Sequence, residues 1–183
     1  MEGRVILTVD REHGALGAEI ARETAKKLGI PAYGRAELNE LLAETSPDDG
    51  KKHVFGKRIL AEDRLFRRQA ELLKELAGRS SCVVIGRCGD YLLRDFEETV
   101  KIFIRAPFHD RVWHLMAGEE ISEPEAEEEI RRIDRERADY YHYYTEREWG
   151  DPEHYDLIFN SSPLGVKGAV KLILNYLEGR KSL

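Results

Sequence analysis

Short runs of apolar, often β-branched residues alternate along the chain with segments whose apolar residues recur at helical spacing. The expected strands cover 4–9, 30–33, 82–85, 99–104 and 156–160. The expected helices cover 18–28, 35–44, 57–77, 108–116, 123–145 and 165–177, with a helical turn at 91–96 and a polar loop at 45–56. Continuous apolar strands are typical of strands that are buried on both faces. Because strands that alternate with helices build parallel sheets covered on both sides, the sequence predicts an α/β fold with a doubly wound parallel sheet.

The composition is typical of one globular domain. At 183 residues, a chain can bury about 70% of its unfolded surface, so we expect a single domain over residues 1–183. No run approaches the ~20 apolar residues that a membrane span requires. The net charge of −6 disfavours a general nucleic-acid binder, which usually presents a basic face. Cys82 and Cys88 have no metal-ligand spacing. Cys82 falls in an expected buried strand, which favours reduced thiols and a cytoplasmic protein.

A run of glutamates precedes a run of arginines in the second half of the chain. Residues 119–129 contain seven Glu, and residues 131–137 contain four Arg. Ser122 and Glu125 have the spacing of a capping box, which predicts a helix from 123 to about 145. A solvated helix with ion pairs four residues apart is the simpler interpretation of the glutamates. The arginines remain candidates for binding an anion.

Two segments follow expected strands and carry side chains or backbone suited to phosphate. Arg87 lies just past the strand at 82–85, at the sheet edge where open α/β folds bind ligands. The turn after the first strand contains Gly14 and Gly17, whose backbone N–H groups could wrap a phosphate. A phosphate loop also needs a Lys and a Ser/Thr, and these positions are occupied by Gly17 and Glu19. Taken alone, this turn favours a purely structural role over phosphate binding.

The three segments together resemble the cytidylate kinase-like family over residues 4–177. Members typically read S-R-E-[FY]-G-S-G-G-R-E-I at the first turn, and the chain departs from that pattern chiefly at His13, Leu16 and Ala18. The residues that agree are Arg11, Glu12, Gly14, Gly17, Glu19 and Ile20. The segment GRCGDY at 86–91 is similar to the family's VGRCADY, and RIDRER at 132–137 is similar to its arginine-rich lid.

The resemblance implies a P-loop-type fold with a helical lid, and a role for each motif. Arg87 would grip the acceptor phosphate with the paired donors of a guanidinium, and Arg132 and Arg135 would neutralise the transferring group. The donor ATP would lie on the first turn, on Arg11, Gly14, Ala15, Leu16, Gly17, Ala18 and Glu19. Mg²⁺ would bridge the donor oxygens, with Asp10 and Asp90 as candidate ligands.

The acceptor side of the site would be built from a helical region at 35–80, and the lid from residues 119–150. Family members often carry an Asp before the second helix, where this chain reads Ala-Tyr-Gly at 32–34. The resemblance therefore leaves Arg35, Glu37 and Gln69 as the candidates for contacts to the acceptor, and Asp90 as a further candidate beside Arg87.

The function that the resemblance implies is ATP-dependent phosphorylation of a nucleoside monophosphate, with CMP or dCMP as the acceptor. The partners would be small-molecule nucleotides, without nucleic acid or membrane. Two alternatives stay open. The missing Lys and Ser/Thr favour a non-catalytic nucleotide-binding or regulatory module, and the missing acceptor Asp favours a kinase of another small metabolite.

Overall fold

The sheet of this protein is parallel throughout and has its first strand at the centre. The structure, a computed structural model, describes residues 4–45 and 55–180. Its strands are β1 (Ile6–Arg11), β2 (Ala32–Tyr33), β3 (Cys82–Ile85), β4 (Thr99–Arg105) and β5 (Leu157–Asn160). In these residues they form one sheet in the order β2-β3-β1-β4-β5, and every neighbouring pair is parallel. This confirms the predicted doubly wound α/β fold.

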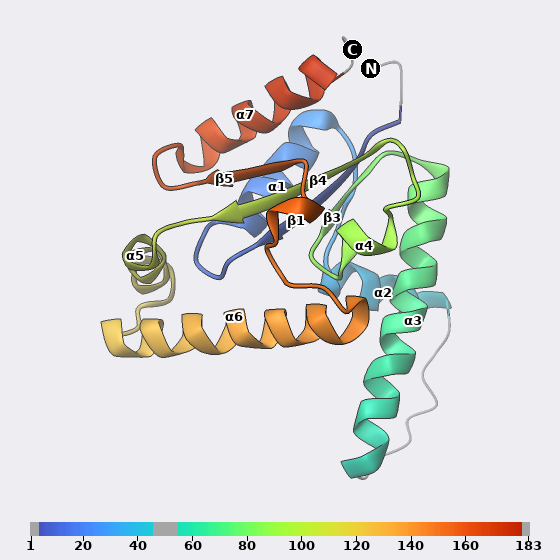
Figure 1. Cartoon of the computed structure of the whole chain (residues 1–183), viewed down its shortest axis with the longest axis horizontal. Helices are drawn as coiled ribbons and strands as arrows, with labels where there is room; N and C mark the ends of the chain where they lie inside the picture. The colour runs from blue at the N-terminus through green and yellow to red at the C-terminus, as the bar shows by residue number, and fades with distance from the viewer. Residues whose placement is uncertain (1–3, 46–54, 181–183) are drawn as a thin grey trace.

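Helices follow the strands in the predicted alternation (Figure 1). They are α1 (Gly17–Leu28), α2 (Arg35–Thr45), α3 (Phe55–Arg79), α4 (Gly89–Leu92), α5 (Phe108–Glu119), α6 (Glu123–Thr145) and α7 (Gly165–Arg180), with a 3-10 turn at Pro152–His154. The helical turn predicted at 91–96 begins earlier, at Gly89, and most of the loop predicted at 45–56 lies outside the described residues. No helix in the described ranges is long and apolar enough to cross a membrane.

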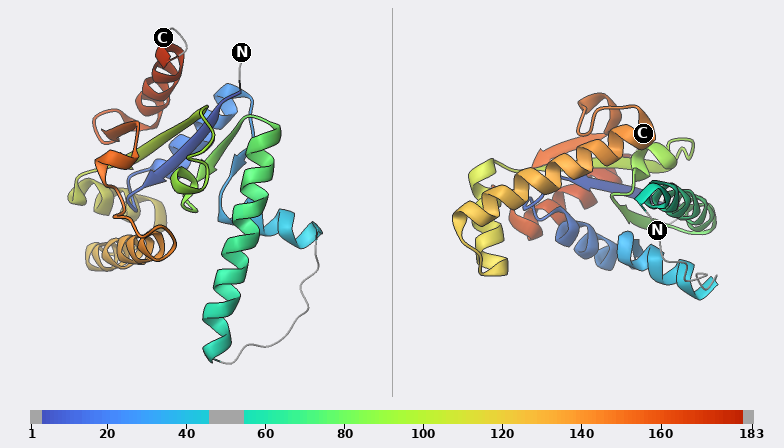
Figure 2. Two further views of the ribbon diagram at one scale, coloured as in Figure 1. Left: turned by 45° about the vertical axis from the view of Figure 1, so that its right-hand side comes forward. Right: turned by 90° about the horizontal axis from the view of Figure 1, so that it is seen from below.

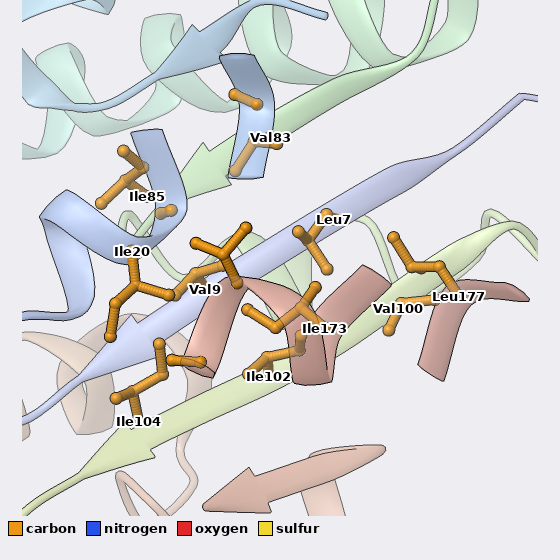
Figure 3. Packing of buried hydrophobic residues seen from close by; sticks show 14 of the residues in the cluster. Leu7, Val9, Ile20, Val83, Ile85, Val100, Ile102, Ile104, Ile173 and Leu177 are labelled. Carbon is orange, nitrogen blue, oxygen red and sulfur yellow. The ribbon is translucent and has the colours of Figure 1, made fainter. Parts of the chain in front are cut away.

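The face of the sheet covered by α1 and α7 holds the larger apolar core. Figure 3 shows side chains of β1, β3 and β4 pointing toward Ile20 of α1 and toward Ile173 and Leu177 of α7. Residues of β1 alternate between the faces, with Leu7 and Val9 on this side. Both residues are almost completely buried, and the continuous apolar run of this strand follows from burial on both sides.

The opposite face packs against α2, α3, α4 and α6. Its core contains Leu38 of α2, Leu73 of α3, Leu92 of α4 and Tyr141 of α6, together with Ile6 of β1. Figures 1 and 2 show α6 as a long helix across this side of the molecule and α3 extending beyond the sheet. The capping box predicted at Ser122 is present and starts α6.

The strand order places a ligand-binding crevice at the carboxyl end of β1. The chain proceeds from β1 to β2 and β3 on one side, and then to β4 and β5 on the other. The connections at the carboxyl ends of β1 and its neighbours therefore diverge, and open α/β sheets bind ligands at such a point. The loop after β1 and the Gly86–Arg87 turn after β3 both lie at this edge.

We expect Gly89→Ala to destabilise the fold by about 1–3 kcal/mol, because an added methyl group overpacks the site. A Cβ on Gly89 would lie 2.8 Å from Cγ1 of Val84 and 3.4 Å from Cγ2 of Thr8. Gly179→Ala in α7 is the matched control, since a Cβ there meets nothing within 4 Å. Chemical denaturation of both variants tests this, and equal stabilities would contradict the close packing of α4 on β1 and β3.

Candidate functional site

A cavity of about 480 Å³ opens at the carboxyl ends of β1 and β3 and is walled on one side by α6. Its charged lining comprises Arg11, Arg22, Arg35, Arg87 and Arg137 against Asp10 and Glu136. The remaining lining residues are Gly34, Ala36, Ile85, Gly86, Cys88, Ile133, Tyr140, Tyr141 and Trp149. Five arginines against two carboxylates leave an excess of positive charge in a partly enclosed space. Such a cavity is suited to an anion that carries several charges.

The loop after β1 has the backbone of a turn that leads into a helix N-terminus. Gly14 has a φ of 79° and Leu16 a φ of 59°, and α1 begins at the next residue. The cytidylate kinase-like family has a glycine at the position of Leu16, and Leu16 adopts the left-handed conformation that a glycine there would adopt more easily. Ala15 is fully buried, and its carbonyl accepts a hydrogen bond of 2.8 Å from the Ser161 hydroxyl. The loop is therefore held from the side of β5.

Side chains from α5 and α6 fix the same loop from the other side. Arg111 is buried, donates through Nη1 to the His13 carbonyl at 3.2 Å, and forms an ion pair with Asp134 of α6. The second Asp134 oxygen accepts the His13 backbone N–H at 2.7 Å. Arg137, one turn further along α6, donates to the Arg11 carbonyl at 2.8 Å. A carboxylate of α6 thus occupies the His13 N–H group of the loop.

The turn after β3 positions Arg87 through an uncommon backbone. Gly86, Arg87 and Cys88 have consecutive φ values of 68°, 60° and 53°, and a non-glycine residue in this region stores strain. The Arg87 guanidinium lies 4.3 Å from the centre of the Tyr140 ring. Its Nη1 donates to Oε1 of Gln69 at 3.3 Å. Arg87 is therefore held between α3 and α6 with its charge toward the cavity.

Gln69 is a buried residue whose amide oxygen accepts a hydrogen bond from Arg87. It is 1% exposed and does not line the cavity, and its amide nitrogen donates to Oδ1 of Asn39 at 2.8 Å. Arg35, its companion among the acceptor-side candidates, does line the cavity. Glu37 instead accepts from Arg22 at 2.7 Å and from the Gly34 backbone N–H at 2.9 Å. It thereby fixes the cavity rim at Gly34.

The two metal-ligand candidates, Asp10 and Asp90, differ in their surroundings. Asp10 lines the cavity at the end of β1, and its Oδ1 accepts the backbone N–H of Arg11. Asp90 lies outside the cavity lining and accepts the Tyr141 hydroxyl at 2.6 Å. Burial raises the pKa of Asp90 to about 6, and the nearby Asp10 charge adds to this, whereas the Tyr141 hydrogen bond opposes it. The described residues contain no group of three or more His, Cys, Asp or Glu side chains arranged for a metal ion.

The structure brings some predicted residues together and leaves others apart. Arg11 and Arg87 share the cavity, whereas Arg132 and Arg135 are exposed and outside its lining. Arg132 pairs with Glu136 at 3.0 Å. Ala18 packs against the α1–α7 core, and Glu19 is exposed. The roles predicted for the side chains of Arg132 and Arg135 remain predictions, and this arrangement gives them no contact with the cavity.

Two arginines that the sequence did not single out line the cavity instead. Arg137 lies on the same side of α6 as Ile133 and Tyr140. The apolar stripe of that helix was therefore the sequence signal that Arg137 faces the interior. Burial lowers its pKa to about 10, and the neighbouring Arg11 charge contributes. Arg22 of α1 reaches the rim through its pair with Glu37, and no local sequence pattern indicates this contact.

Comparison with known proteins matches the cytidylate kinase-like family over residues 6–163. A cytidylate kinase from Pyrobaculum islandicum is 23% identical over 175 residues, which cover 94% of this chain and 92% of the relative. An uncharacterised protein from Eubacterium ventriosum has a similar structure, with a TM-score of 0.83, 25% identity, and coverage of 97% and 99% of the two chains. A shikimate kinase from Bacteroides thetaiotaomicron shares the fold, with a TM-score of 0.58, 16% identity, and coverage of 95% and 98%.

We expect Asp134→Ala to lower the free energy of unfolding by about 2–4 kcal/mol, because it leaves the buried Arg111 charge with only the longer ion pair to Glu12, 3.7 Å from its Nε. The exposed Asp139 on the same helix provides the matched control, Asp139→Ala, whose effect should stay within about 0.5 kcal/mol. Thermal and denaturant unfolding measure both. Equal effects would show that the Arg111–Asp134 pair does not hold α6 on the loop.

We also expect the stability of the protein to depend on Asp90 between about pH 4 and pH 6. The pKa of Asp90 is raised in the folded state, so the stability associated with its protonated form is complete below the unfolded pKa and is lost as the pH rises through the folded pKa. Asp90→Asn removes this titration. Its stability relative to the wild type should rise by about 2–3 kcal/mol from pH 4 to pH 7. Parallel pH profiles of the two proteins would contradict the burial of the Asp90 charge.

Proposed function

Because the chain belongs to the cytidylate kinase-like family, and its family and fold support a kinase of nucleotides or small metabolites, we propose that it transfers the terminal phosphoryl group of ATP to a nucleoside monophosphate, CMP or dCMP. The observation that carries the proposal is the cavity with five arginines at the carboxyl ends of β1 and β3. The negative charges of two phosphate groups would balance the excess of positive charge in this cavity.

The acceptor phosphate would lie on Arg87. The Tyr140 ring and the Gln69 amide orient its guanidinium in advance, so little side-chain entropy is lost when a phosphate binds. Arg35, at the start of α2, lines the same part of the cavity as Gly34 and Ala36 and would supply a second contact. The glutamine predicted as a substrate contact would serve as a positioning residue for Arg87.

The donor would lie with its phosphates on the N-terminus of α1, where backbone N–H groups point toward an anion. Asp10 offers carboxylate oxygen at the cavity wall, which is the ligand chemistry that Mg²⁺ prefers. When bound, Mg²⁺ would neutralise part of the donor charge. An acceptor phosphate oxygen would form the new bond to the terminal phosphorus as the bond to ADP breaks. No strong base is needed, because that oxygen already carries charge.

Residues 119–150 would form a lid over the two phosphates, with α6 as its main element. Arg137 already lines the cavity, and Gly118 and Gly150 lie on either side of α6. Phosphoryl transfer depends chiefly on positioning and charge neutralisation, which a closing arginine-bearing helix provides. Arg132 and Arg135 would reach the phosphates only if α6 turns or moves on closure.

Two observations favour a non-catalytic nucleotide-binding module as the second candidate. The loop has Gly17 where a Lys would contact the donor phosphates, and Asp134 occupies the His13 N–H group. A protein with these features could hold a nucleotide without transferring its phosphoryl group.

A coupled kinase assay with Mg-ATP and a panel of nucleoside monophosphates tests the proposal. Turnover with CMP or dCMP is the expected result. Binding of nucleotides in a thermal-shift experiment without turnover would support the second candidate. If no nucleotide on the panel is turned over but a different phosphorylated or hydroxylated metabolite is, the protein is a kinase of another substrate class.

We expect Arg87→Ala to lower kcat/KM for the acceptor about 100- to 1,000-fold, because it removes a preorganised charged donor from the transition state. Arg94→Ala is the matched control, since Arg94 stacks on Tyr91 outside the cavity lining. Steady-state kinetics and thermal unfolding of both variants separate function from folding. A large loss of stability in Arg87→Ala, with acceptor use unchanged, would assign Arg87 a structural role.

A further inference from the structure

We propose that Arg11 replaces the missing phosphate-loop lysine, and that Gly17 is required because the Arg11 side chain occupies the space of a side chain at position 17. In the pattern G-x-x-x-x-G-K, Arg11 stands at the first glycine and Gly17 at the lysine. Compared with that pattern, the basic residue stands at the position of the first glycine, and a glycine stands at the position of the lysine. The inference deepens the proposed function, and rests on it for the identity of the reaction.

The aliphatic part of Arg11 lies directly over the first residue of α1. A Cβ on Gly17 would be 2.6 Å from Cγ of Arg11, and closer still to its Cβ. No pair of real side chains tolerates such a distance, so Arg11 excludes every residue except glycine from position 17. The φ of Gly17 is not in the left-handed region, which leaves the overlap with Arg11 as the reason for the glycine.

The guanidinium of Arg11 ends beside the turn that carries the acceptor arginine. A Cβ on Gly86 would lie 2.7 Å from Nη1 of Arg11. The side chain therefore spans the distance from the N-terminus of α1 to the residue before Arg87. A cation at this place lies between the proposed donor and acceptor phosphates, where the transferring group passes.

The charge of Arg11 has little compensation within the protein. Its closest carboxylate in the described part of the chain is Asp10, with Nη1 3.9 Å from Oδ1. The Arg11 side chain is only 20% exposed, and Arg87 and Arg22 line the same cavity with like charge. A partly desolvated cation with like charges nearby is costly unless an anion joins it. A polyphosphate would supply that anion.

The test measures binding of Mg-ATP and of magnesium tripolyphosphate by calorimetry, in the absence of an acceptor. Arg11→Met keeps the bulk over Gly17 and removes the charge, and we expect binding at least 10-fold weaker. Arg105→Met, at an exposed position at the end of β4, removes the same charge outside the cavity and should bind as the wild type does. Thermal unfolding without ligand should show Arg11→Met folded at the assay temperature.

The reciprocal exchange gives the sharper result. Arg11→Gly should bind as weakly as Arg11→Met, and Gly17→Lys alone should bind weakly because its side chain meets Arg11. The double variant R11G/G17K frees that space and restores a loop lysine, so its affinity should return to within about threefold of the wild type, a difference of about 0.7 kcal/mol. Wild-type affinity in Arg11→Met, no recovery in the double variant, or no binding of Mg-ATP to the wild type would each overturn the assignment.

These outcomes are separate from the outcome of the substrate panel. If the wild type phosphorylates CMP and the Arg11 variants bind Mg-ATP unchanged, the role of Arg11 is wrong and the proposed function stands. If the Arg11 variants lose Mg-ATP and no acceptor on the panel turns over, the role of Arg11 stands and the proposed reaction is wrong.

Discussion

The ion pair between Arg111 and Asp134 connects the loop after β1 to the helix that walls the cavity. Arg111 is buried on α5 and also holds the His13 carbonyl, while Asp134 on α6 holds the His13 N–H. The cost of burying these charges is met by their mutual attraction and by the loop hydrogen bonds. With α6 in this position, the next two turns of the helix bring Arg137 to the Arg11 carbonyl and Tyr140 to Arg87. The shape and the charge of the cavity therefore depend on this pair.

The cavity gathers arginines whose repulsion a phosphate-bearing ligand would relieve. Burial lowers the pKa of Arg137 to about 10 and also lowers the pKa of Arg11. The carboxylates of the lining, Asp10 and Glu136, balance only part of this charge. In a partly enclosed space the repulsion is screened less than at an open surface. Binding of a polyphosphate should therefore stabilise the protein, and this is consistent with the kinase family to which the chain belongs.

The fold could be predicted from the sequence because its local signals agree with the tertiary structure. Strands buried on both faces leave continuous apolar runs, and the Ser122 capping box marked the start of α6. The site was less predictable, because side chains from separate elements meet there. The arginine run of α6 was visible, and its apolar stripe separates Arg137 from Arg132, but only packing shows that the side with Arg137 faces the cavity. The contact of Arg11 with Gly17 depends on how the loop folds back, which the spacing alone does not specify.

The central claim is that one arginine cavity receives the donor and the acceptor phosphates together. Calorimetric titration with a bisubstrate ligand, adenosine joined to cytidine through five phosphates, tests it most directly. If both ends bind at once, the affinity should exceed that of ATP by a factor on the order of 100 or more, and excess ATP or excess CMP should each weaken it. An affinity no higher than that of ATP, unchanged by CMP, would contradict the account.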